Sequence, residues 1–127
     1  MEATLVKEFV TVAHGNLDAV KQLLAFQPAL LNSVWDWGGG DYESGIEGAS
    51  HVGNREIALY LLEQGARPTM FMAAMLGHLE IVKNFLTAYP ALINCKGPHG
   101  LSLIHHARKG GEPAQPVLAY LESLGAM

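Results

Sequence analysis

The chain has 127 residues, half of them apolar and 16% charged, with a formal net charge of −4 at pH 7. This length fits one domain, residues 1–127, and the acidic balance without a basic stripe argues against nucleic acid as a partner. No apolar run approaches the roughly 18 residues of a membrane-spanning helix, and the charged N-terminal residues do not form a signal peptide. With Cys95 as the single cysteine, which is compatible with a reducing compartment, we expect a cytoplasmic monomer without membrane contact.

Short amphipathic helices are predicted in pairs along the chain. Leu5, Phe9 and Val12 lie on one apolar face of the first helix, and Pro28 ends the second. The predicted helices cover residues 2–13, 17–27, 44–52 and 55–64, two runs on either side of Gly77 within residues 69–87, and two more in residues 102–127. The last helix is predicted to start after Pro113 and Pro116. Each helix is too short to be stable alone, so the helices must stack on one another.

The helix pairs form an internal repeat marked by glycines. Gly15, Gly53, Gly77 and Gly111 each separate two short helical runs, as a residue that adopts left-handed dihedrals can do. Shifting the chain by 62 residues aligns residues 15–32 with residues 77–94, and nine of these 18 positions are identical. The spacings between the glycines are 38, 24 and 34 residues, so the first connection is long and the second is short.

The best-preserved motif is Ser102-Leu103-Ile104-His105-His106-Ala107, which is similar to the ankyrin cue Thr-Pro-Leu-His-x-Ala. The chain thus resembles an ankyrin repeat protein of the small bacterial type. The resemblance implies an all-α fold, an ankyrin-repeat solenoid of about four helix-turn-helix repeats with hairpin-like loops. The repeats would cover roughly residues 1–32, 33–66, 67–94 and 95–127. A hairpin-like finger is expected in residues 28–43, and none where Arg67-Pro68-Thr69 runs straight into a helix.

The resemblance implies a non-catalytic protein–protein interaction module, which presents a concave helical face and loop fingers to an unidentified protein partner. Trp and Tyr are common in interface hot spots, although the finger's rings could instead fold back over helix ends. The candidate partner-binding residues are His14, Trp35, Trp37, Tyr42, His51, Met75 and Lys109. An alternative is a small-molecule or peptide-binding pocket, in a groove closed by the Trp35/Trp37 loop.

Catalytic, metal and cofactor sites are not predicted. The six histidines lack the Cys/His spacing of a zinc site, and the resemblance gives His105 a structural role, hydrogen-bonded to turn backbone. Lys96 could lower the pKa of its neighbour Cys95, yet no histidine or acid lies near it in sequence. The run Gly38-Gly39-Gly40 lacks the Lys-Ser/Thr of a phosphate loop, although it would let the finger bend. We therefore expect that the protein is not an enzyme.

Overall fold

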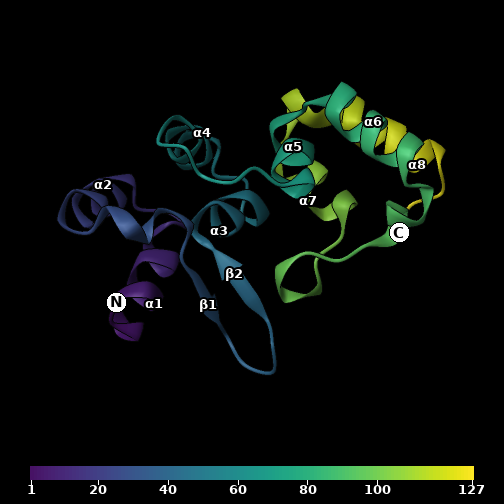
Figure 1. Ribbon diagram of the computed structural model, residues 1–127. Helices are drawn as coiled ribbons and strands as arrows, with labels where there is room; N and C mark the ends of the chain where they lie inside the picture. The colour runs from purple at the N-terminus through teal and green to yellow at the C-terminus, as the bar shows by residue number, and fades with distance from the viewer.

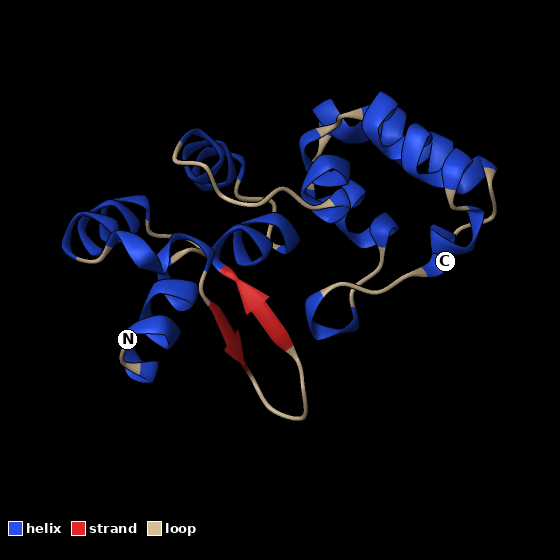
Figure 2. Cartoon of the chain, in the orientation of Figure 1, coloured by secondary structure: helices blue, strands red, loops and turns tan.

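The computed structural model describes all residues from 1 to 127 and is built mainly of helices (Figure 1). The helices are α1 Ala3–Val12, α2 Leu17–Phe26, α3 Gly45–His51, α4 Arg55–Glu63, α5 Met70–Leu76, α6 Leu79–Ala88, α7 Leu103–Lys109 and α8 Gln115–Ser123. The predicted all-α class is confirmed, and one two-stranded sheet is added to it (Figure 2). The predicted start of the last helix is wrong: α8 begins at Gln115, ahead of Pro116. Proline is tolerated in a first turn, where its missing N–H would be unpaired anyway.

The helices pack as four successive pairs, α1 with α2, α3 with α4, α5 with α6, and α7 with α8. The first helices of the pairs lie side by side, since α3 contacts both α1 and α5, and α5 contacts α7. The apolar core runs continuously through all four pairs and includes Phe9, Ile46, Met75 and Leu103. Leu86 on α6 belongs to it and is 4% exposed, so its predicted burial is confirmed.

Local signals in the sequence explain where several helices begin and end. Ser44, Thr69 and Ser102 each accept the backbone N–H three residues ahead, which satisfies a donor that has no partner inside the helix. Ser44 and Glu47 complete this into a capping box at the start of α3. Gly77 ends α5 at φ 86°, the left-handed conformation predicted for it.

The predicted finger is a β-hairpin that projects beside α1 and α3 (Figures 1 and 2). Strands β1, Val34–Asp36, and β2, Tyr42–Ser44, pair antiparallel with Trp35 opposite Glu43. All three glycines of the connecting turn have positive φ. The Asp36 carboxylate accepts the backbone N–H groups of Gly38 and Gly40. The turn that was expected to bend is therefore held by Asp36.

A second, shorter finger precedes α7. Lys96 and Ser102 form an isolated antiparallel bridge, and a 3₁₀ turn over Pro98–Gly100 carries His99 at φ 61°. Residues 67–69 form no strand, in agreement with the finger expected to be missing there.

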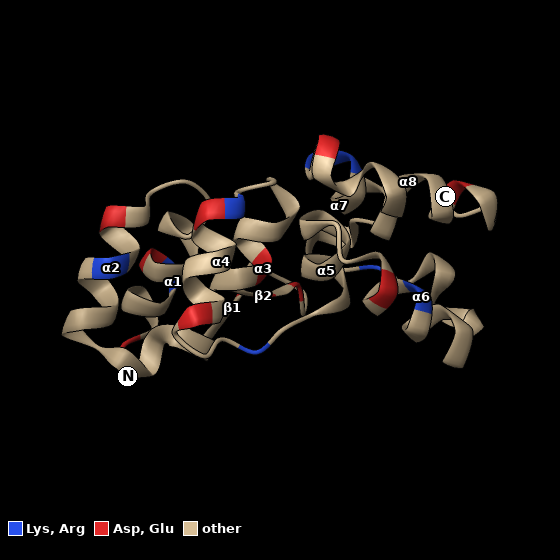
Figure 3. Ribbon diagram, turned by 90° about the horizontal axis from the view of Figure 1, so that it is seen from above, with Lys and Arg blue, Asp and Glu red and all other residues tan.

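Lysine and arginine residues are scattered over several elements (Figure 3). No helix is both long and apolar enough to cross a membrane.

Candidate functional site: a histidine–carboxylate cluster

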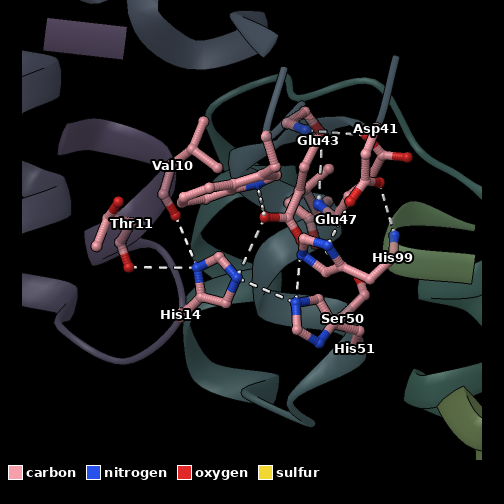
Figure 4. A network of polar contacts seen from close by, with 12 residues as sticks. Val10, Thr11, His14, Asp41, Glu43, Glu47, Ser50, His51 and His99 are labelled. Atoms are coloured by element: carbon pink, nitrogen blue, oxygen red, sulfur yellow. Dashed lines mark hydrogen bonds and ion pairs between the residues drawn. The ribbon is translucent and has the colours of Figure 1, made fainter. Parts of the chain in front are cut away.

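Four side chains from four separate segments converge beside the base of the hairpin (Figure 4). His14 follows α1, Glu43 lies on β2, His51 ends α3, and His99 lies in the turn before α7. One nitrogen or oxygen of each side chain lies within 4.8 Å of the corresponding atom of the others. We refer to these four residues as the histidine cluster.

Glu43 forms the buried centre of the histidine cluster. Alternation along β2 turns Tyr42 outward and Glu43 inward, where it is 0% exposed. Glu43 Oε1 accepts the indole N–H of Trp37 at 2.9 Å and lies 3.2 Å from His14 Nε2. Oε2 lies 3.0 Å from His51 Nε2 and 3.3 Å from His99 Nε2. These last two contacts are close enough for ion pairs, but Oε2 accepts no hydrogen bond.

Hydrogen bonds outside the cluster orient two of the imidazole rings. His14 Nδ1 lies 2.8 Å from the Val10 carbonyl oxygen, and His99 Nδ1 lies 2.7 Å from Asp41 Oδ2. An oxygen without hydrogen can only accept, so Nδ1 carries the proton in both rings. Nε2 of each ring therefore faces Glu43, as a lone pair when the ring is neutral and as an N–H donor when it is protonated. Asp41 also accepts the backbone N–H of His99 at 2.7 Å, which ties the two fingers together.

Gly48 on α3 makes room for the ring of His14. A Cβ at this position would lie 2.7 Å from His14 Cε1, closer than real side chains approach. A glycine inside a helix costs roughly 1 kcal/mol relative to alanine, so its presence here is explained by the close approach of the ring. Above the rings, an open hollow lined by Thr11, His14, Trp37 and His99 connects the cluster to solvent.

The cluster shifts the proton affinities of its members. Burial works to raise the pKa of Glu43, but the close imidazoles of His14 and His51 outweigh it and hold this pKa far below its ordinary value. The contact with the Glu43 carboxylate raises the pKa of His14 against the opposing effect of burial. The backbone N–H of His99, together with its ring, lowers the pKa of Asp41. Both carboxylates are thus kept ionised beside the imidazoles.

The predicted partner-binding residues are distributed unevenly over the structure. His14 and His51 meet, with Nε2 atoms 3.0 Å apart, and Trp37 joins them through Glu43. Tyr42 is 60% exposed on the hairpin, and Lys109 is exposed at the end of α7.

Two residues of the predicted surface are involved in packing instead. Met75 is 1% exposed, so its side chain is not available to a partner, and Gly110 at the end of α7 lies close against its backbone. Trp35 is half-buried against the core, with Lys7 Nζ 5.8 Å from its ring centroid. The interpretation in which a ring folds back over a helix is therefore correct for Trp35.

The sequence analysis missed Glu43 and His99, and its expectation of no metal site did not foresee a cluster of metal-ligating groups. One signal could have indicated it: His14 and His51 occupy similar positions at the ends of successive first helices. His105 is structural as expected, but its partner differs, because Nε2 bonds the His51 carbonyl oxygen at 2.8 Å rather than its own turn. This contact links α7 to α3 directly.

The residues considered for catalysis are not arranged for it. Burial raises the pKa of the Cys95 thiol, which outweighs the opposite effect of Lys96. The Ser50 hydroxyl is buried and donates to the Ile46 carbonyl oxygen. The predicted pocket closed by the Trp35/Trp37 loop has a partial counterpart: Trp37 lines the hollow above the histidine cluster, but Trp35 does not. A separate hollow lies between α2 and α4, around Leu24 and Tyr60.

Comparison with known proteins gives one informative similarity. No family model matches the sequence. The chain is 30% identical over 110 residues to the Target of rapamycin complex 2 subunit AVO2 of Saccharomyces cerevisiae, and the match covers 76% of this chain. The chain spans about a quarter of that protein, since the match covers 24% of its length.

Proposed function

We propose that this chain is an ankyrin-type helical solenoid that binds another protein and carries out no chemistry itself. Support comes from the four helix pairs with their first helices in a row and from the fingers at two of the three junctions. The similar yeast protein is named as a subunit of a complex, which fits a role in assembly. Repeats of this kind join nearest-neighbour contacts into one rigid surface.

The observation that carries the proposal is the joining of the two fingers. Asp41 on the hairpin holds His99 in the second finger through two contacts of 2.7 Å. A polar hollow lies between the fingers, lined by Tyr42, Phe71 and Lys96 among others. Tyr42 stands exposed at its edge, where a large ring with a hydroxyl suits an interface. We place the partner on this joined edge, with an unidentified protein as the occupant.

Two tyrosines of matched exposure allow a clean test. Tyr42 on the hairpin is 60% exposed and Tyr89 at the end of α6 is 61% exposed. A photo-crosslinking residue is placed at each position in turn, in cells that express the full chain. We expect one protein to crosslink from position 42 and not from position 89. Equal crosslinking from the two positions, or none from position 42, would contradict the proposed surface.

The crosslinked protein is then produced and its affinity measured by titration calorimetry. An aromatic hot spot carries about 2 kcal/mol or more, so Tyr42→Ala is expected to weaken binding at least tenfold. Tyr89→Ala should leave the affinity unchanged, and neither variant should lower the melting temperature, because both side chains are exposed. If Tyr42→Ala binds normally, the partner lies elsewhere on the molecule.

A further inference from the structure

We propose that His14, Glu43, His51 and His99 form a binding site for a divalent transition-metal ion, with Zn²⁺ as the ion that fits best. Three imidazole nitrogens and one carboxylate are a ligand set that zinc accepts in tetrahedral geometry. Calcium and magnesium prefer a shell of oxygens, which this site does not offer. Metal binding at this site does not depend on the proposed protein partner, because all four ligands come from this chain.

The distances between the four side chains suit a single ion. Zinc–nitrogen bonds of about 2.0–2.1 Å place neighbouring ligand atoms of a tetrahedron roughly 3.3 Å apart. His14 Nε2 lies 3.0 Å from His51 Nε2 and 3.2 Å from Glu43 Oε1. His99 Nε2 lies 3.3 Å from Glu43 Oε2. All the ligand atoms lie within 4.8 Å of one another, so the side chains must rotate to bring the wider pairs to the spacing of a tetrahedron.

The surroundings of the cluster match those of a metal site. Ligand histidines in proteins usually give their other ring N–H to a carbonyl or carboxylate, which fixes the ring and its tautomer. His14 does so to Val10 and His99 does so to Asp41. Gly48 clears the space that the ring of His14 needs. The sequence therefore provides for the orientation of the rings as well as for their presence.

The buried carboxylate gives an independent reason for a cation. Glu43 is 0% exposed, and its Oε2 accepts no hydrogen bond although two imidazole Nε2 atoms lie 3.0 and 3.3 Å away. A buried charged oxygen without a partner is costly. An ion between Oε2 and the three Nε2 atoms would satisfy all four groups. Because these groups supply four protein ligands, the site is structural, joining α1, the hairpin, α3 and the second finger.

The test measures metal binding by the full chain in the absence of any partner. The purified protein is stripped with a chelator, exchanged into metal-free buffer at pH 7.5 and titrated with ZnCl₂ by calorimetry. We expect one ion per chain. Titration with Co²⁺ should give the intense visible absorption of tetrahedral cobalt, which reports the geometry directly. The absence of saturable binding would overturn the proposal and leave the cluster as a network of hydrogen bonds and ion pairs.

Two variants and a control locate the ion. His99→Asn removes one imidazole from an exposed turn while keeping a residue that tolerates the left-handed φ of this position. His51→Ala removes another ligand, and circular dichroism checks that it folds. Each is expected to lower the Zn²⁺ affinity at least tenfold. His78→Ala, which replaces an exposed histidine before α6, should bind as the wild type does. Unchanged affinity in His99→Asn, or an equal loss in His78→Ala, would place the ion elsewhere and overturn the proposal.

Discussion

Two histidines of this protein differ in proton affinity because their neighbours differ. His14 faces the Glu43 carboxylate, and this contact raises its pKa. His106 is 1% exposed and packs against Phe71, with ring centroids 4.9 Å apart. Burial is the main cause that lowers the pKa of His106 to about 4, helped by the nearby His105. The same residue type thus favours the charged form in one place and the neutral form in the other.

The low pKa of His106 predicts a loss of stability in mild acid. The unfolded chain takes up a proton near pH 6.5 and the folded chain only near pH 4. The unfolded state therefore binds more protons between these values, and the free energy of unfolding falls as the pH falls from 6.5 to 4. The loss from this residue should reach about 3 kcal/mol, at 1.36 kcal/mol for each unit of pKa difference.

The measurement compares urea unfolding of the wild type and His106→Leu at several pH values, with a chelator present. Leucine cannot be protonated, and the Ser102 carbonyl oxygen still accepts the backbone N–H of residue 106. Titrating groups that do not interact with His106, such as His14, affect both proteins alike. The difference between the two curves should therefore change between pH 6.5 and 4 and be constant above pH 7. Parallel curves over the whole range would show that His106 does not titrate with a lowered pKa.

At the scale of elements, Gly77 at the junction between α5 and α6 packs closely against the turn at Pro113, just before α8. Gly77 ends α5 in the left-handed conformation, and a Cβ there would meet the Pro113 carbonyl oxygen. Gly65 after α4 is also left-handed, at φ 95°, but nothing lies within 4 Å of its missing Cβ. A side chain at Gly65 would meet only the cost of the left-handed backbone, whereas a side chain at Gly77 would meet that cost and a clash with neighbouring backbone.

Alanine at these two glycines should therefore have unequal effects. Gly65→Ala should lower the free energy of unfolding by roughly 1–2 kcal/mol, the cost of a left-handed alanine. Gly77→Ala should lower it by a further 1–3 kcal/mol or so, because the new methyl group forces the Pro113 turn away. Chemical unfolding of the two variants measures both effects. Equal losses would mean that the Pro113 turn yields without cost.

The helices were largely predictable from the sequence because their signals are local. Ser44 and Ser102 cap the helices that follow them, and the glycine spacing indicated the pairs. The position of Pro116 misled because proline both ends helices and starts them. The histidine cluster was out of reach of such signals: His14 and His51 lie 37 residues apart in sequence, and their meeting depends on how α1 packs on α3. His99 joins only because the hairpin and the second finger touch.

At the scale of the whole molecule, the contacts of the histidine cluster reach most of the chain. Its members come from the first and second helix pairs, from the hairpin between them and from the finger that precedes the fourth pair. Helix α7 follows that finger and packs on α3, α5 and α8, so it connects the cluster to the C-terminal pair. Helix pairs that pack on one another in this way stabilise their neighbours, and a small set of them can unfold as one unit.

This connection predicts that zinc, if it binds as proposed, protects helices that hold no ligand. At a free ion concentration a hundred times the Kd, binding adds about 2.7 kcal/mol to the free energy of unfolding. Amides that exchange only through global unfolding should then exchange about a hundred times more slowly. We expect this slowing in the core of α8, Gln115–Ser123, as well as in α1 and α3.

Hydrogen exchange followed by mass spectrometry measures both ends of the chain in one experiment. His99→Asn, examined at the same zinc concentration, should lose most of the slowing in all three helices, because its affinity for zinc is lower. Slowing confined to α1 and α3 would show that the C-terminal pairs open independently. The contacts of α7 with α3, which include the hydrogen bond from His105 to the His51 carbonyl oxygen, make the single unit the expected behaviour.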